Sequence, residues 1–411
     1  MKREETFWQG LVLFLVFLST VGVYAVLGWL LLQLRQGGPG TDSVQLSQPG
    51  YVVQIVEPLN GAVLQRSASI AIRSALVEPG FVRAEFQVDE RTVAVEVNPD
   101  PQAAPWMVQW VWAEAGEGSH VLAVQASRAE GGVERSLPVT VTVVPSGKLV
   151  FSSNREGAYA IYAMQTGGGG LERLTGSPGD AHQPAPRRDG GLAFVAETTT
   201  GQAMIRQLGD YEEQGTDLFA GVDPAWAPEG LSLAFAANVD GASQVFVAQE
   251  GDGITLQVTR EEVYGAQPTW SPDGEHLAYV AERDGNWDIW IVALDGSEPQ
   301  RLTADPAMDW TPAWSPSGER LAFVSNRGGS HQIYTIRADG TDVRLLSDFP
   351  LGAESPSWSP DGSWLALVAY TGEGNGINAR EIHLMRSDGQ YLVRLTYDSF
   401  DDTEVRWAWI P

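Results

Sequence analysis

The chain has 411 residues, of which 43% are hydrophobic, and it contains no cysteine. Its 26 basic and 52 acidic residues give a net charge of −26. This balance disfavours nucleic acid and anionic lipid surfaces as partners, because both are bound by basic surfaces. The absence of cysteine excludes disulfides, a thiol nucleophile and Cys-ligated metals.

The first predicted element is a membrane helix within residues 1–35. From Leu11 to Leu32 the chain is uncharged and almost wholly apolar, and a helix of that length crosses about 30 Å of hydrocarbon. Lys2 and Arg3 precede the run, which predicts a cytoplasmic N-terminus and a single-pass protein of the cell membrane with its bulk outside the cytoplasm. A signal peptide cleaved near Ala25 is the alternative, but the length of the apolar run favours a retained anchor.

A linker and a β-domain are predicted next. Residues 36–50 are rich in Gly, Pro, Ser and Gln, which is typical of a flexible linker. Between residues 51 and 145, about seven short alternating runs are separated by turn residues, a pattern that predicts a β-sandwich. EPLNGAVL at 57–64 and GSHVLAVQAS at 118–127 resemble segments of bacterial immunoglobulin-like domains, and the resemblance implies a spacer role.

Residues 147–411 form a repeat region with a period of 44 residues. In PTWSPDGEHLAYV at 268–280, Ser, Pro, Asp and Gly occupy the four positions of a type I turn, with Gly free to take a positive φ. The turn predicts a hairpin between a first and a second strand, with the tryptophan before it packed between neighbouring sheets. The proline of each clear repeat is followed two residues later by a tryptophan: Pro224 and Trp226, Pro268 and Trp270, Pro312 and Trp314, Pro356 and Trp358.

Four short strands per repeat are typical of a β-propeller blade. The repeat region opens at Lys148 in a second strand and ends with VRWAW at 405–409, a first strand with nothing after it. Counting the strands gives six of each kind, which predicts a six-bladed ring closed by pairing of the C-terminal strand with the N-terminal blade. Closure removes open sheet edges. The predicted fold class is therefore all-β, an immunoglobulin-like sandwich plus a six-bladed propeller, preceded by one transmembrane helix.

Repeats of the form PxWSPDGxxLAFxSxRxGxxxIYxxxxDGxxxxRLT resemble those of TolB-like propellers, and the resemblance spans residues 147–411. It implies a periplasmic binding protein that engages partner proteins of the cell envelope. The N-terminal α/β module of the family's best-known member is replaced here by the predicted anchor and sandwich. The resemblance is therefore to the propeller and not to the whole of that protein.

No catalytic, cofactor or metal site is predicted. The chain has no G-x-S-x-G elbow and no HExxH motif, and its five histidines are dispersed. Two acidic clusters, at 398–404 and 210–213, hold hard oxygen ligands suited to calcium, but neither has the spacing of an EF-hand loop. We interpret them as solvated loops, with a calcium site as the alternative.

The connections between fourth and first strands should emerge on one face of the ring. They are residues 217–223, 260–267, 304–310, 347–354 and 397–404, and each mixes carboxylates with large apolar side chains. Exposed aromatics on loops commonly bind partners. We predict a partner-binding face of four aromatic residues, Tyr264, Trp310, Phe349 and Phe400, ringed by four carboxylates, Glu262, Asp309, Asp348 and Asp401. Inward packing of the aromatics against the blade ends is the alternative.

These features together predict a membrane-anchored, non-enzymatic receptor or scaffold that engages a protein or peptide of the cell envelope. The alternatives are a glycan- or ion-binding sensor and a cryptic hydrolase, since one fold hosts many functions.

Overall fold

The computed structural model describes residues 51–67, 69–176, 180–198, 200–208, 215–250, 255–260, 264–297, 299–372 and 379–408. The described residues form strands and turns without a helix, as the all-β prediction requires. Accordingly, this part of the chain holds no helix long and apolar enough to span a bilayer. The predicted anchor at 11–32 and the linker lie outside it.

The described residues group into two compact units. The first comprises those of Met1–Asn60, Ala71–Trp112 and Val121–Val139, and the second those of Gly61–Ile70, Ala113–His120 and Thr140–Pro411. Strands β2 (Ala62–Gln65) and β9 (Val139–Val144), which pair in parallel, belong almost wholly to the second unit.

The first unit is built from two sheets. One has the order β1-β3-β6, and in the other β5, β4, β7 and β8 pair in that order. Phe86 stacks on Trp110 across the two sheets, with ring centroids 5.9 Å apart, and the Trp110 indole N–H donates to Ser74 Oγ at 2.8 Å. An immunoglobulin-like classification of this unit stays a prediction. The strands are β1 (Val53–Glu57), β3 (Ser69–Leu76), β4 (Phe81–Val88), β5 (Arg91–Val97), β6 (Trp106–Ala113), β7 (Gly118–Arg128) and β8 (Val133–Arg135).

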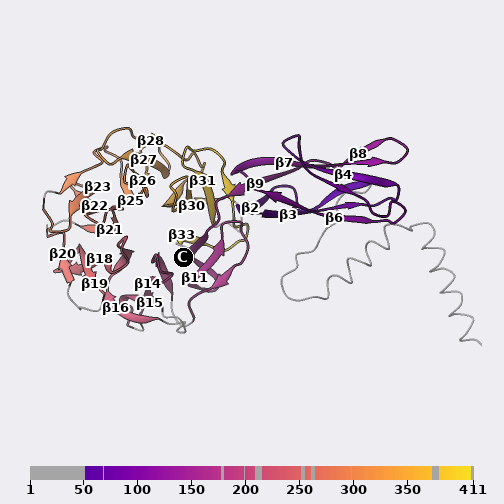
Figure 1. Cartoon of the computed structure of the whole chain (residues 1–411). Coiled ribbons are helices and arrows are strands. Elements are labelled where there is room, and N and C mark those ends of the chain that lie inside the picture. Colours follow the sequence, from indigo (N-terminus) through magenta and orange to yellow (C-terminus); the bar gives the residue numbers. More distant parts are fainter. Residues whose placement is uncertain are drawn as a thin grey trace, which may run out of the picture. The chain divides into compact units, whose positions relative to one another are not determined.

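The second unit contains six four-stranded antiparallel sheets arranged as a ring (Figure 1). We call the sheets blades 1 to 6 in chain order. Blade 1 holds β10 (Lys148–Glu156), β11 (Ala158–Gln165), β12 (Glu172–Arg173) and β33 (Asp402–Ala408); blade 2 holds β13 (Ala181–Pro186), β14 (Leu192–Glu197), β15 (Ala203–Leu208) and β16 (Thr216–Ala220); blade 3 holds β17 (Val222–Trp226), β18 (Ser232–Val239), β19 (Ala242–Gln249) and β20 (Thr255–Gln257). Blade 4 holds β21 (Gly265–Trp270), β22 (His276–Arg283), β23 (Asn286–Ala293) and β24 (Gln300–Arg301); blade 5 holds β25 (Asp309–Trp314), β26 (Arg320–Ser325), β27 (Gln332–Arg337) and β28 (Arg344–Leu345); blade 6 holds β29 (Ala353–Trp358), β30 (Trp364–Tyr370), β31 (Arg380–Arg386) and β32 (Val393–Arg394).

Blade 1 closes the ring with strands from both ends of the repeat region. Strand β33 pairs antiparallel with β10, so that Lys148 lies opposite Ala408 and Leu149 opposite Trp407. The predicted closure is confirmed. In blades 2 to 6, by contrast, all four strands are consecutive in the chain.

The repeated turn and its tryptophan take the predicted places. The Gly274 N–H donates to the Ser271 carbonyl at 2.9 Å, and Gly274 has a positive φ of 75°. The indole N–H of Trp270 donates to the Ala225 carbonyl of blade 3 at 3.0 Å. Trp358 of blade 6 makes the equivalent contact, since its indole N–H donates to the Ala313 carbonyl of blade 5. These tryptophans therefore join neighbouring blades.

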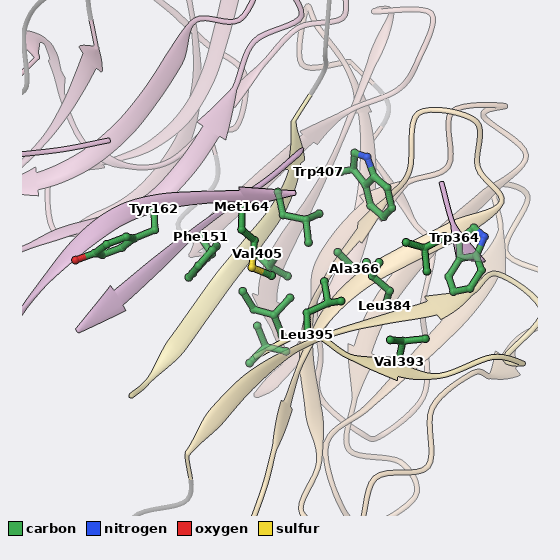
Figure 2. Close-up of a cluster of buried hydrophobic side chains, with 14 of the residues drawn as sticks. Phe151, Tyr162, Met164, Trp364, Ala366, Leu384, Val393, Leu395, Val405 and Trp407 are labelled. Atoms are coloured by element: carbon green, nitrogen blue, oxygen red, sulfur yellow. The ribbon is translucent and has the colours of Figure 1, made fainter. Parts of the chain in front are cut away.

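The hydrophobic core of the ring lies between blades, in six clusters, one for each neighbouring pair. The cluster between blades 6 and 1 contains Phe151, Trp364 and Trp407 (Figure 2). Phe151 and Trp364 are completely buried. Since each large aromatic removes some 150–250 Å² from water, this cluster stabilises the closure by several kcal/mol at about 25 cal/mol per Å².

Candidate binding funnel

The first strand of every blade contains one residue with an unusual backbone. These residues stand directly before the repeat proline or its counterpart, coincide with a break in strand register, and have φ between 48° and 57°. Such angles are uncommon for residues other than glycine. Because they recur in all six blades, they are a systematic feature of the repeat, of the kind that is often found at functional sites. We call this set the polar ring: Gln183, Asp223, Gln267, Thr311, Ser355 and Glu404.

Side chains of the polar ring accept hydrogen bonds from the backbone of the next blade. Glu404 accepts from the Gln183 N–H at 2.7 Å, and Gln183 accepts from the Asp223 N–H at 2.8 Å. Asp223 accepts from the Gln267 N–H at 3.1 Å, and Gln267 accepts from the Thr311 N–H at 2.8 Å. The ring thereby links five first strands, because each of these side chains reaches the backbone of the next blade.

Charged groups are concentrated on one side of the polar ring. Burial raises the pKa of Asp223, and the negative charge of Glu404 raises it further. The pKa of Glu404 is lowered in spite of burial, because His182, the Gln183 N–H and Ser152 stabilise the carboxylate. Its hydrogen bond with His182 raises the pKa of that imidazole. Burial lowers the pKa of Arg406, and the carboxylates of Glu404 and Asp223 oppose this shift.

A cavity of about 530 Å³ opens beside the polar ring, and we call it the funnel. Its polar part comes from Gln183, Asp223 and Gln267, and its aromatic part from Tyr264, Trp287, Trp310 and His331, with Val222, Ala266, Val280 and Met308 between them.

The aromatic rings of the funnel pack edge to face in two pairs. The ring centroids of Tyr264 and Trp287 are 4.8 Å apart, and those of Trp310 and His331 are also 4.8 Å apart. Edge-to-face pairs fix side chains in place, so the funnel offers a preformed aromatic surface. Burial raises the pKa of the Tyr264 hydroxyl, and the nearby Asp223 charge adds to this.

The structure brings two of the four predicted aromatic residues together. Tyr264 and Trp310 both line the funnel. Phe349 is half-buried and packs edge to face on His383, as the inward-packing alternative expected. Phe400 is 38% exposed and lies outside the funnel, 6.0 Å from the Arg155 guanidinium.

The four predicted carboxylates are also dispersed. Asp309 is completely buried and accepts two hydrogen bonds from Arg327, both at 2.9 Å, so it stabilises the blade and does not reach the surface. Asp401 pairs with Arg380 at 2.5 Å. Asp348 is exposed, and Glu262 lies outside the described residues.

Sequence reasoning missed the polar ring, Arg406, Trp287 and His331. A signal for part of the ring was present, because polar residues stand immediately before Pro184, Pro224 and Pro268. The aromatic pairs carried no such signal, since Trp287 and His331 come from a different strand or loop of the blade than the residues they contact.

The fold defines a class, the six-bladed β-propellers, and within it the chain is similar to TolB-like propellers. The family model described as TolB beta propeller domain matches residues 219–348. Among solved structures, TolB from Acinetobacter baumannii is similar with a TM-score of 0.56 and 18% identity, over 72% of this chain and 80% of that one. A putative TolB from Agrobacterium tumefaciens has a TM-score of 0.50 and 22% identity, over 64% and 99%.

A similar fold also occurs in a protein with a very different name. The hydrazine synthase of Kuenenia stuttgartiensis aligns with a TM-score of 0.50 and 14% identity, over 65% of this chain and 48% of that one. At these identities the similarities establish the fold alone. No curated protein matches the chain.

Proposed function

We propose that the propeller binds a protein or peptide segment of the cell envelope in the funnel, without catalysing a reaction on it. The observation that carries the proposal is the combination of aromatic side chains with polar and charged side chains in the lining of one cavity. A cavity of this size falls within the usual range of about 300–1,000 Å³ for binding sites. The similarity to TolB structures supports a protein-interaction role for the fold.

The chemistry of the lining suits a peptide better than a purely apolar ligand. Tyr264 and Trp287 offer aromatic area that pairs with apolar side chains, and aromatic residues dominate binding energies at interfaces. Amide and carboxylate oxygens accept more than one hydrogen bond, so Gln183, Gln267 and Asp223 can pair with a peptide backbone in addition to their bonds within the polar ring. The apolar run at residues 11–32 supports a placement of the propeller outside the cytoplasm, held at the membrane.

The test is affinity capture with the full chain, purified in a mild detergent, from a solubilised envelope extract. The funnel variant combines Tyr264→Ser with Met308→Ser, since both side chains are more than 40% exposed and their loss should leave the fold intact. The matched control is Tyr397→Ser, a 71% exposed tyrosine outside the funnel. We expect capture of one partner to fall at least tenfold with the funnel variant, since hot-spot residues contribute about 2 kcal/mol or more.

Equal capture by the funnel variant and the control would contradict this site. A Phe400→Ser variant separates the funnel from the wider predicted face, because Phe400 lies on the same loop set but outside the cavity. If no envelope protein is retained while soluble glycans raise the melting temperature of the wild type only, a glycan-binding role replaces the proposal.

A further inference from the structure

Three carboxylates converge where blade 6 meets the strand that closes the ring. Glu381 lies in β31, Asp402 begins β33, and Asp398 lies in the connection between blades 6 and 1. One carboxylate oxygen from each residue lies within 4.8 Å of the others. Glu381 and Asp402 are completely buried, and Asp398 is half-buried.

Two oxygens of this cluster have no hydrogen-bond partner. Glu381 Oε1 accepts from Arg394 at 3.0 Å, and the Thr396 hydroxyl also favours the ionised carboxylate, but Oε2 is buried without a well-formed hydrogen bond. Asp402 Oδ1 accepts from Arg155 at 2.8 Å, and the Ser153 hydroxyl favours its ionised form, but Oδ2 is equally buried without a well-formed hydrogen bond. Buried polar atoms are almost always satisfied, and an unsatisfied carboxylate oxygen is especially unfavourable. These oxygens are therefore the groups of the cluster that are open to a positive ligand.

Charge balance supports the same conclusion. The three carboxylates carry three negative charges when ionised, and the two guanidinium groups that contact them, Arg155 and Arg394, supply two positive charges. Arg155 is shared, since it lies 2.8 Å from Asp402 and 3.6 Å from Asp398. One negative charge stays uncompensated within the cluster.

The corresponding position between blades 4 and 5 provides an internal comparison. Asp309 lies opposite Ser325 in the strand pairing, just as Asp402 lies opposite Ser153. Asp288 and Glu381 are also equivalent, because each stands directly before an isoleucine at the same place in the third strand of its blade. There both Asp309 oxygens accept from Arg327.

The carboxylate of Asp288 is also satisfied at that position. It accepts from Arg301 at 2.6 Å, from the Asn286 amide at 3.3 Å and from the Thr303 hydroxyl at 3.5 Å. In blade 6 the place of Asn286 is taken by Ala379, which has no donor to offer. The position between blades 4 and 5 therefore needs no ion, and among the described residues buried carboxylate oxygens without a hydrogen bond occur only where blade 6 meets blade 1.

We propose that Glu381, Asp398 and Asp402 form a binding site for a hard divalent cation, Ca²⁺, at the seam between blade 6 and the closing strand. Calcium takes oxygen ligands at about 2.3–2.6 Å, so that its ligands lie up to roughly 5 Å apart, as these do. The ion would use the two unpartnered oxygens and draw Asp398 to them. It would tie β31 to β33 and so strengthen the closure of the ring, whatever the funnel binds.

A proton is the competing occupant of the cluster. Burial raises the pKa of Glu381, with Thr396 and Arg394 opposing it, and burial raises the pKa of Asp402, with Ser153 and Arg155 opposing it. A single proton would satisfy one of the two oxygens and would need no metal. Binding measurements at neutral pH separate the two occupants.

The experiment uses the full chain in mild detergent, treated with a chelator, desalted and titrated with CaCl₂ at pH 7.5. Bound ⁴⁵Ca²⁺ is counted by equilibrium dialysis, and the melting temperature of the propeller is followed in parallel. The variants are Glu381→Gln and, as the gentler change, Asp398→Asn. The matched control is Asp288→Asn, which removes a buried carboxylate from the corresponding position of blade 4.

We expect the wild type and Asp288→Asn to bind one more tight Ca²⁺ than Glu381→Gln or Asp398→Asn, and only the first two to melt several degrees higher with calcium. Counting the difference in sites removes weak binding to the acidic surface. Equal stoichiometry in the wild type and Asp398→Asn would overturn the proposal. Unchanged melting of the wild type up to millimolar calcium, without a tight site, would overturn it as well and leave the proton as occupant.

Discussion

Blade 1 and blade 5 each have four strands but differ in how the first strand is connected to the second. In blade 5 the strands β25 and β26 are joined by a tight turn, in which the Gly318 N–H donates to the Ser315 carbonyl at 2.9 Å. In blade 1 the first strand β33 comes from the far end of the chain and pairs with β10 without a turn between them. The Asp401 N–H also donates to Asn154 Oδ1 at 2.9 Å across this seam.

The two blades nevertheless repeat the same buried ion pair. Arg155 binds Asp402 in blade 1 as Arg327 binds Asp309 in blade 5, and both carboxylates are completely buried. The comparison shows that one sequence motif serves two purposes. In blade 5 the pair fixes a hairpin that the turn already holds, whereas in blade 1 it joins segments 247 residues apart.

The largest expected effect comes from removing these arginines. Arg155→Ala and Arg327→Ala each leave a buried carboxylate without its partner, which destabilises by roughly 3–5 kcal/mol. We expect Arg155→Ala to be the more severe, because Arg155 contacts both Asp402 and Asp398. The measurement is the free energy of the propeller's unfolding transition in urea. If Arg155→Ala proves milder than Arg327→Ala, the seam is held mainly by its hydrophobic cluster.

A smaller, pH-dependent effect is expected from His383 in blade 6, whose ring occupies the position of Tyr334 in blade 5. Burial lowers the pKa of His383 to about 4, with the charge of Arg394 acting in the same direction. The pKa in the unfolded chain is the ordinary 6.5. Stability is therefore fully present above pH 6.5 and is lost as the pH falls from 6.5 towards 4, because the unfolded chain takes up the proton first.

The matched variant is His383→Tyr, which places in blade 6 the ring that blade 5 already carries. Between pH 7 and pH 4.5 the wild type should lose about 2–3 kcal/mol more unfolding free energy than the variant. Comparing the two proteins cancels the titration of the carboxylates that they share. Parallel stability profiles for wild type and variant would show that His383 is not buried in its neutral form.

The smallest effect is expected in the turns that blade 1 lacks. Asp361 accepts from Ser359 Oγ at 2.6 Å and from the Ser363 N–H at 3.0 Å. At the corresponding place in blade 5 stands Ser317, whose hydroxyl accepts from the Glu319 N–H at 3.3 Å. Asp361→Ser should therefore lower the unfolding free energy by less than about 1 kcal/mol. A loss of several kcal/mol in urea unfolding would mean that the aspartate holds more than its own turn.

The candidate site was less predictable than the fold. Tyr264 and Trp310 could be selected because the 44-residue period places their loops on one face. Burial could not be read in the same way. Asp309 and Phe349 come from equivalent loops, yet Asp309 is completely buried and Phe349 half-buried, because Arg327 and His383 lie behind them.

The amino-acid sequence by itself determined the four strands of each blade, the turns, the tryptophans between neighbouring blades and the pairing of the two ends of the repeat region in one sheet. These follow from local rules: a type I turn, alternating strands, and a repeat that begins and ends in the middle of a blade. Only the tertiary structure decided which side chains of different strands meet. The polar ring, the edge-to-face pairs of the funnel and the cluster of Glu381, Asp398 and Asp402 each depend on distances between side chains of different strands and loops. Those distances are set by how the strands and blades pack, which no local pattern records.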